Sequence, residues 1–555
     1  MPVIEVNIED LRKLLGRDAT IEELSDRMPM LGIEWEGNTE DSLQLQIFPN
    51  RPDMLSIEGL ARAYDSFMGH RTGFREYTVK ESGVTAIIDK KVEKVRPYFV
   101  TAIVRNIDFD DALIRSIIQM QEKLHVTHGR RRRKVAIGLH NLEPIEFPIT
   151  YTTKPPEFKF RPLGERFEKD LTWILTEMHT GREYAWTVEG FEEYPMIVDA
   201  KGMVLSMPPI INGEYTRIDE ATTDIFIDIT GTDMKAITET LNIITTTFAD
   251  RGADIYSVRN EYHDGETIVT PYLEPREMTV ENEYIVRTLG FDLSPEESAK
   301  YLEMMGHGAV AGDTLNVNVP RYRTDVMHPM DLVEDVAIAY GYDNVIPVVP
   351  DIASQAGEEP LEVFSRGLRN FMVGFGLQEV LTFMMSNKEK LFTRMGLPEE
   401  PIAVTSNPKM EAYDSLRNRL IPSLLEVLTN NKHHPYPQNI YELDDVVLID
   451  PSTETGARST RRLAVILCHA KANFSETKAM LNAVLENLGL PVEIQEGGWD
   501  CFIEGRRFTA THEGKPVCWA GEIKPEVLLS WDLEMPVAAL EMDIDYLFRA
   551  LKPEE

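Results

Sequence analysis

The segment RYRTDVMHPMDLVEDVAIAYGYDN, residues 321–344, carries the most distinctive pattern in the chain. Pro329 suits the first turn of a helix, because its ring presets φ and it has no N–H to leave unpaired. Beyond it Leu332, Val336 and Ala339 recur at helical spacing. The segment therefore predicts a helix that begins near Pro329 and buries one face.

Acidic side chains gather at the start of this predicted helix. Asp331, Glu334 and Asp335 are three and four residues apart, so their carboxylates share one face, and Asp325 lies just upstream. Four carboxylates this close repel one another unless a cation joins them, and hard oxygen ligands suit Mg²⁺. A solvated acidic helix start that complements the helix dipole is the alternative, and spacing alone leaves both open.

The length and charge of the chain limit its class. At 555 residues it should contain three to five domains of roughly 100–200 residues each. Its net charge of −35, from 92 acidic and 57 basic residues, repels phosphate backbones. A nucleic acid would therefore have to be met by local basic patches.

The sequence predicts no membrane partner and a cytoplasmic location. No run of about 18 apolar residues occurs, and the opening residues have no signal-peptide pattern. Cys468, Cys501 and Cys518 lack metal-ligand spacing and fit a reducing compartment. His140, in a predicted strand over 135–141, has no second histidine at ligand spacing, so we expect a structural or gating role.

Five consecutive basic residues, Arg130, Arg131, Arg132, Arg133 and Lys134, follow a helix predicted over 110–129. Most short basic runs are solvated loops. In a chain this acidic the run is also a candidate for phosphate contact, and the sequence does not decide between the two.

Two further segments suggest a small pocket. Pro208 and Pro209 interrupt the apolar run 194–219, which is typical of a rigid wall. The strand predicted within 225–233 places Asp228 and Thr230 two residues apart, on one face. The pair could recognise a small polar group or only cap the sheet edge, and both interpretations remain open.

The C-terminal part reads as helices and strands of an antiparallel sheet after a linker at 350–360. The helices are expected at 361–376 and 415–434 and the strands at 377–386, 440–449, 461–470, 491–497 and 536–545. Nearer the N-terminus, Arg51 and Asp53 predict a local salt bridge.

Three separated motifs occur in a fixed order along the chain. They are NRPDMLSIEGLARAY (50–64), the segment 321–344, and SLRNRLIPSLL (415–425) with GEIKPEVL (521–528). In these motifs the chain resembles the β subunit of phenylalanyl-tRNA synthetase, in its short archaeal and eukaryotic-cytosolic form.

The resemblance implies a multidomain α+β fold. Its parts would be an N-terminal B1-like domain (1–90), a B3/4-like editing domain (91–266), a helical, metal-binding B5-like domain (267–350), and a B6–B7 module (355–555). The last would keep a class II synthetase-like antiparallel sheet without catalytic activity and pack against an α subunit.

The resemblance also implies the function and partners. The chain would support ATP-dependent attachment of phenylalanine to tRNA(Phe) on the α subunit, within an (αβ)₂ heterotetramer. It would hydrolyse mischarged Tyr-tRNA(Phe) in its own editing domain, because an apolar pocket discriminates weakly against an added hydroxyl. A free-standing Tyr-tRNA deacylase and a non-editing scaffold subunit are the alternatives.

Residues can be carried over from the family in two groups. The Mg²⁺ ligands, shared with the α subunit, would be Asp325, Asp331, Glu334 and Asp335. The editing pocket would contain Met196, Ser206, Asp228 and Thr230, of which Asp228 and Thr230 match in type and spacing. Which residues contact tRNA is not evident from the sequence.

Overall fold

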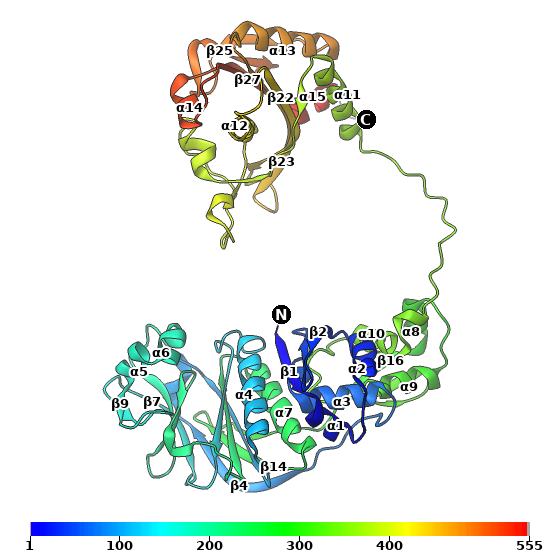
Figure 1. Ribbon diagram of the computed structural model, residues 1–555, viewed down its shortest axis with the longest axis vertical. Helices are drawn as coiled ribbons and strands as arrows, with labels where there is room; N and C mark the ends of the chain where they lie inside the picture. The colour runs from blue at the N-terminus through cyan, green and yellow to red at the C-terminus, as the bar shows by residue number, and fades with distance from the viewer. Residues whose placement is uncertain (1, 552–555) are drawn as a thin grey trace. The chain divides into compact units, whose positions relative to one another are not determined.

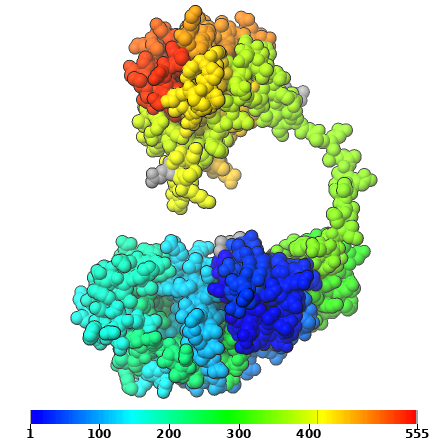
Figure 2. Space-filling model, viewed as in Figure 1, coloured from blue at the N-terminus to red at the C-terminus, as the bar shows by residue number. Residues whose placement is uncertain are grey.

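The protein, seen here as a computed structural model that describes residues 2–551, forms two compact units, Met1–Val349 and Pro350–Glu555 (Figure 1). Residues 345–359 have no helix or strand and are exposed along their length (Figure 2). The linker expected at 350–360 therefore lies within a longer extended segment. No helix in the described range is long and apolar enough to cross a bilayer.

The N-terminal part of the first unit is a small α+β layer. Its strands β1 (Val3–Asn7), β3 (Ser42–Gln46) and β2 (Glu34–Asn38) pair antiparallel in that spatial order. The helices that cover them are α1 (Ile8–Leu15), α2 (Ile21–Arg27) and α3 (Ile57–Phe67). Asn7 and Thr20 cap α1 and α2 with their side chains, because each accepts a backbone N–H of the first turn.

A ten-stranded mixed sheet forms the middle of the first unit, in the order β12-β11-β10-β7-β4-β14-β5-β13-β6 with β15 beside β14. The strands are β4 (Val79–Ile88), β5 (Tyr98–Arg105), β6 (Val135–Asn141), β7 (Ile149–Lys154), β10 (Tyr194–Val198), β11 (Val204–Met207), β12 (Ile211–Asn212), β13 (Ile225–Gly231), β14 (Asp254–Tyr262) and β15 (Thr267–Thr270). The helices α4 (Asp111–Val126) and α7 (Met234–Asp250) lie between one face of this sheet and the N-terminal layer (Figure 1).

Strand pairing crosses two of the segment boundaries expected from the sequence. β4 falls within 1–90 yet pairs with β14 and β7 of the large sheet. β15 lies beyond 266 yet pairs antiparallel with β14. The polar residues 263–266 form the turn of this hairpin, since polar turn residues mark a hairpin as readily as a domain boundary.

The segment from 276 to 344 is a mixed α+β structure, which corrects the expectation of a helical domain. Three helices are present, α8 (Asn282–Leu289), α9 (Pro295–Met304) and α10 (Pro329–Tyr340). They pack on an antiparallel sheet of β16 (Arg276–Glu281), β18 (Thr314–Val319) and β17 (Gly308–Val310). Leu315, Val317 and Val319 alternate inward along β18, so their burial needs a partner layer.

Buried ion pairs join the parts of the first unit. Arg251, just after α7, pairs with Asp10 at 2.7 Å and also with Glu58 of α3. Arg62 of α3 pairs with Asp250 at 2.5 Å. These contacts, together with one continuous apolar core, hold the N-terminal layer against the large sheet.

The second unit contains a seven-stranded, largely antiparallel sheet in the order β19-β22-β23-β27-β26-β25-β24. The strands are β19 (Gln378–Glu379), β22 (Gln438–Ile449), β23 (Ala457–Cys468), β24 (Glu493–Glu496), β25 (Phe502–His512), β26 (Lys515–Ile523) and β27 (Val537–Asp543). The helices include α11 (Pro360–Gly374), α12 (Ile421–Asn430) and α13 (Phe474–Leu488).

Two expectations for this unit were wrong. Residues 377–386 form only two short strands, β19 and β20 (Met385–Ser386), rather than one. The helix expected over 415–434 starts only at Ile421, one residue before Pro422, because Arg417 is drawn into buried ion pairs instead. β25 and β26 were not anticipated.

Candidate functional site

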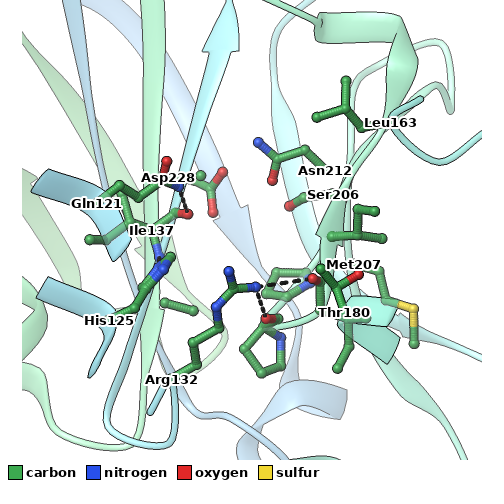
Figure 3. A pocket seen from close by; sticks show the side chains of 16 residues that line it. Gln121, His125, Arg132, Ile137, Leu163, Thr180, Ser206, Met207, Asn212 and Asp228 are labelled. Carbon is green, nitrogen blue, oxygen red and sulfur yellow. Dashed lines mark hydrogen bonds between the residues drawn. The ribbon is translucent and has the colours of Figure 1, made fainter. Parts of the chain in front are cut away.

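The pocket that carries the most unusual chemistry lies between α4 and the sheet strands β6, β11, β12 and β13 (Figure 3). Its volume is about 160 Å³, below the roughly 300–1,000 Å³ of pockets for drug-sized ligands. It therefore suits one small ring or side chain. Pro208 and Pro209 form part of its wall, as the sequence indicated.

Asp228 enters the pocket from β13, whose seven residues are all buried. The strand pairs with β5 and β6, and Asp228 lies opposite Gly138 of β6. A Cβ at position 138 would stand 2.0 Å from Asp228 Oδ1, so only glycine leaves room for the carboxylate.

A buried histidine fixes the orientation of Asp228. His140 Nε2 donates to Asp228 Oδ1 at 2.5 Å, while its Nδ1 accepts from the hydroxyl of Thr216 at 2.7 Å. The carboxylate only accepts, which places the proton of the ring on Nε2. His140 is fully buried, so it acts behind the pocket as the structural side chain that the sequence suggested.

The four residues expected in the pocket separate into two pairs. Ser206 of β11 and Asp228 line it together. Thr230 lies two residues along β13, where its hydroxyl accepts from Arg96 Nε at 2.8 Å, and it is not part of the lining. Met196 of β10 is fully buried and is not part of the lining, and its apolar cluster also contains the lining residues Met207 and Ile210.

Of the polar lining residues, Gln121 and Asn212 have no local sequence signal, and Arg132 was expected only as a candidate for phosphate contact. Gln121 of α4 donates to Ile137 O at 2.7 Å, and Asn212 of β12 donates to Leu139 O at 3.2 Å. Arg132, from the basic run, donates to Pro209 O and Ile210 O at 3.1 Å each. They come from three elements, so only the fold brings them together (Figure 3).

Three buried polar atoms at this pocket have no hydrogen-bond partner among the described residues. They are Ser206 Oγ, Arg132 Nε and Thr180 Oγ1, the last from α6 (His179–Tyr184). Buried polar groups are nearly always satisfied in native proteins, so a cluster of exceptions calls for an explanation. One explanation that accounts for all three atoms is a polar ligand that hydrogen-bonds to them when it is bound.

Burial, hydrogen bonding and a nearby charge shift the pKa values of two side chains at the pocket wall, His125 and Glu122. Burial lowers the pKa of His125 to about 4, so its Nε2 is free to accept from Ile137 N at 2.9 Å. The hydrogen bond from His125, with the charge of Arg132, lowers the pKa of Glu122 to about 2. Glu122 in turn pairs with Arg132 at 2.8 Å and holds its guanidinium at the pocket.

The four carboxylates expected to bind Mg²⁺, Asp325, Asp331, Glu334 and Asp335, line a second pocket of about 540 Å³, with the loop after β3. Arg323, two residues before Asp325, was missed by the sequence reasoning and lies among them. It pairs with Asp325 at 2.8 Å and with Asp335 at 2.7 Å. Although burial alone would raise their pKa, Arg323 lowers the pKa of both Asp325 and Asp335.

The other two carboxylates are differently placed. Asp331 accepts the backbone N–H groups of Met327 and His328 at 2.6 and 2.7 Å, as the reciprocal cap of α10. Burial, and then the nearby carboxylates, raise the pKa of Glu334. Neither makes an ion pair with a described residue, and nowhere among the side chains that the structure describes do three acidic, histidine or cysteine residues converge as a ready metal-ligand set.

The local salt bridge expected at Arg51 is present and belongs to the same region. Arg51 pairs with Asp53 at 2.8 Å, and both are buried. Arg51 also lines the acidic pocket.

Comparison with known proteins defines the class of the chain as a component of an aminoacyl-tRNA synthetase. Four family models match in succession. They are the Phe-tRNA synthetase beta subunit B1 domain (residues 1–70), the B3/4 domain (86–259), the tRNA synthetase B5 domain (278–342) and the phenylalanyl tRNA synthetase beta chain CLM domain (346–544).

Full-length relatives and one solved structure agree with these matches. The phenylalanine–tRNA ligase beta subunit of Pyrococcus abyssi is 41% identical over 99% of this chain and 100% of its own length. That of Archaeoglobus fulgidus is 38% identical over 99% of each chain. The crystal structure of an N-terminal fragment of the Pyrococcus horikoshii beta subunit matches with a TM-score of 0.60 at 39% identity, covering 61% of this chain and all of the fragment. The chain belongs to the phenylalanine–tRNA ligase beta subunit family.

Proposed function

We propose that the pocket around Asp228 hydrolyses tyrosine from mischarged tRNA(Phe). The observation that carries the proposal is the set of three buried, unpartnered polar atoms beside the Asp228 carboxylate in one small cavity. A tyrosyl ester brings a phenol hydroxyl and an ester carbonyl, which supply a donor and acceptors for such a set.

Selection of tyrosine over phenylalanine would rest on the phenol. Asp228 would accept a hydrogen bond from the phenol O–H, with one carboxylate oxygen already held by His140 Nε2 at 2.5 Å. Ser206 Oγ, without a partner among the described residues, supplies a second contact. A site built to bind a hydroxyl rejects the analogue without it strongly, because its buried polar groups are then left unpaired.

Hydrolysis would use a positioned water. Ser206 has no base within hydrogen-bond distance among the described residues, which disfavours a serine nucleophile. Arg132 Nε is buried without a partner among the described residues and would donate to the ester carbonyl, where negative charge develops during attack. Thr230 holds Arg96, and Met196 backs the wall, so both support the site from behind.

The test is deacylation of Tyr-tRNA(Phe) by the complex with the α subunit. Asp228→Asn keeps the shape and removes the charge, and we expect hydrolysis to fall by about 100-fold or more. Glu143→Gln, an exposed carboxyl on the loop after β6, is the matched control. Undiminished hydrolysis by the Asp228 variant would rule out this role.

We further propose that phenylalanine and ATP are activated on the α subunit and that the second unit is an inactive class II synthetase-like module that packs against it. The buried arginines of this unit are all neutralised by carboxylates. Arg417 pairs with Glu442 at 2.9 Å, Arg462 with Glu541 at 2.8 Å and Arg419 with Glu400 at 2.9 Å. A triphosphate would therefore find no free buried cation on the described part of this sheet.

Co-expression with the α subunit tests the partnership, which we propose to be an (αβ)₂ heterotetramer in the cytoplasm. The mass of the complex gives the stoichiometry, and phenylalanine-dependent ATP–pyrophosphate exchange gives the activity. A beta chain that is soluble and deacylates Tyr-tRNA without α would favour a free-standing deacylase. An active complex without deacylation would favour a scaffold.

The acidic pocket is proposed to hold Mg²⁺ together with the α subunit. Asp331 and Glu334 lack a cation partner among the described residues and fit the one or two carboxylates that Mg²⁺ takes. Asp325 and Asp335 already make ion pairs with Arg323, and they would contribute to the Mg²⁺ site while remaining paired with this arginine. When bound, the ion would neutralise the remaining carboxylates and leave positions for water and partner ligands.

A further inference from the structure

The basic run after α4 forms a left-handed turn. Arg130, Arg131 and Arg132 have φ of 48°, 55° and 63°, a region that L-residues other than glycine, asparagine and aspartate seldom adopt. Backbone hydrogen bonds hold the turn against the end of α4, with Arg132 N donating to His125 O at 3.1 Å and Lys134 N to Gly129 O at 2.8 Å. Three consecutive arginines are thus kept in a disfavoured conformation.

The turn divides its side chains between the pocket and solvent. Arg132 points inward, where it lines the pocket and packs 4.3 Å from the ring centroid of Tyr184. Lys134 pairs with Asp233 at 3.0 Å. Arg130, Arg131 and Arg133 are exposed and form no ion pair with any residue in the described range.

Three unpaired arginines side by side are unexpected on this chain. It carries 92 acidic and 57 basic residues, so carboxylates are available to most cations. A solvated loop does not explain them, because glycine or asparagine would make the same turn without strain. Backbone strain is generally found where a functional geometry requires it.

The position of the turn indicates what the arginines meet. They are exposed and flank Arg132, which lines the pocket proposed to hold the aminoacyl ester, and from this we infer that they lie at its rim. That ester is joined to the single-stranded 3′ end of tRNA, whose phosphates must approach the same rim. A surface of net charge −35 repels the tRNA elsewhere, so a local cationic rim is needed to admit it.

We propose that Arg130, Arg131 and Arg133 bind the phosphates of the single-stranded 3′ end of the tRNA and deliver the ester to the pocket. The guanidinium fork suits this role, because it binds phosphate oxygens in a bidentate manner. The inference rests on the proposed editing function, and it adds the residues that recognise the nucleic-acid part of the substrate.

The test uses the assembled αβ complex and a variant that keeps the turn. Arg130→Gly and Arg131→Gly remove two charges and favour the observed φ, and Arg133→Gln removes the third. A second variant carries Arg130→Asn and Arg131→Asn with Arg133→Gln. Asparagine also tolerates the observed φ, and it serves as the test if two glycines make the turn too flexible. The matched control replaces three exposed lysines that do not line the pocket, Lys300, Lys409 and Lys471, by glutamine.

Two substrates separate phosphate contact from pocket chemistry. One is Tyr-tRNA(Phe), and the other is 3′-O-tyrosyl-adenosine, which has the ester and base but no phosphate. For Tyr-tRNA we expect KM to rise about tenfold or more with kcat little changed. The slope of log(kcat/KM) against log salt should become shallower by about 2, at about 0.7 for each single-strand phosphate contact. Hydrolysis of tyrosyl-adenosine should be unaffected, and the melting temperature should not fall, because glycine relieves the strain at 130 and 131. The control variant should behave as the parent on both substrates.

Each other outcome overturns the proposal. An unchanged KM and salt slope on Tyr-tRNA would show that the arginines do not contact phosphate. An equal loss on both substrates would place their effect inside the pocket. A wild-type complex that leaves Tyr-tRNA intact would refute the editing function itself, and this inference would fall with it.

Discussion

Arg323 offers a direct test of how the acidic pocket is stabilised. Its guanidinium makes ion pairs with Asp325 and Asp335 and donates to Met305 O at 3.1 Å. The Asp335 side chain is only 4% exposed and its other partner is His307. Arg323→Met removes the charge at similar length and leaves two largely buried carboxylates facing each other.

The expected cost follows from that burial. Breaking a buried pair by removing one partner destabilises a protein by about 3–5 kcal/mol, because the remaining charge is uncompensated. At roughly 2–4 °C per kcal/mol, the melting transition that includes the first unit should fall by about 6–20 °C. Scanning calorimetry of the full chain in EDTA measures this without contributions from divalent cations.

Two further variants show whether the loss is electrostatic. Adding Asp335→Asn to Arg323→Met should recover part of the stability, because one uncompensated charge disappears. Lys13→Met breaks an exposed pair with Glu9 and should change stability by less than about 0.5 kcal/mol. If Arg323→Met melted within about 1 °C of the parent, the arginine would not be what neutralises these carboxylates.

Three other predictions concern the two sites. Gly138→Ala would drive a methyl group against Asp228. Tyr-tRNA hydrolysis should therefore fall about 100-fold, while phenylalanine attachment continues. The control is Gly367→Ala, at a position on α11 where an added methyl group meets open space. Because the pKa of His125 is about 4 when folded and about 6.5 when unfolded, the unfolded state binds more protons between these values. Stability should therefore fall by up to about 3 kcal/mol as pH drops from 6.5 to 4, and urea titrations of His125→Gln should lose that dependence. Mg²⁺ at 100 times its Kd should raise stability by about 2.7 kcal/mol in thermal scans, and Glu334→Gln should abolish the shift.

The local signals in the sequence predicted many elements well. The helix from Pro329 and the strand that carries Asp228 both depend on neighbours within four residues. Such patterns are set by the backbone and by the period of each element, so they can be recognised without the fold. The family resemblance then supplied the domain types, which local patterns alone would not.

What the sequence could not predict depends on distant pairing. The pocket joins Gln121, Arg132 and Asn212 to Ser206 and Asp228, and these come from five places along the chain. Their spacing follows the order of strands in the large sheet, which is not encoded by any short motif. The expectation that Met196 lines the pocket was carried over from the family resemblance, and Met196 is not part of the lining.

The ion pairs of Arg323 could have been predicted from the sequence, because the pattern that indicates them lies within the segment 321–344. The pattern Arg-x-Asp occurs at Arg51-Asp53 and again at Arg323-Asp325, and in both places the arginine pairs with that aspartate. A salt bridge was expected at the first and not considered at the second. The acidic spacing favoured a metal, and an arginine supplies the same positive charge.

The acidic pocket and the Asp228 pocket therefore differ in which of their polar groups have no partner. Arg323 already satisfies the most buried carboxylates of the acidic pocket, so a cation there would act on Asp331 and Glu334 at its open side. The Asp228 pocket keeps unpartnered buried donors, and it lies against the strained arginine turn. Unsatisfied donors and backbone strain both cost free energy, so their coincidence at one cavity is best explained by a ligand that satisfies the donors and needs the turn. An ester carried by a polyanion meets both requirements, whereas a free amino acid would meet only the first.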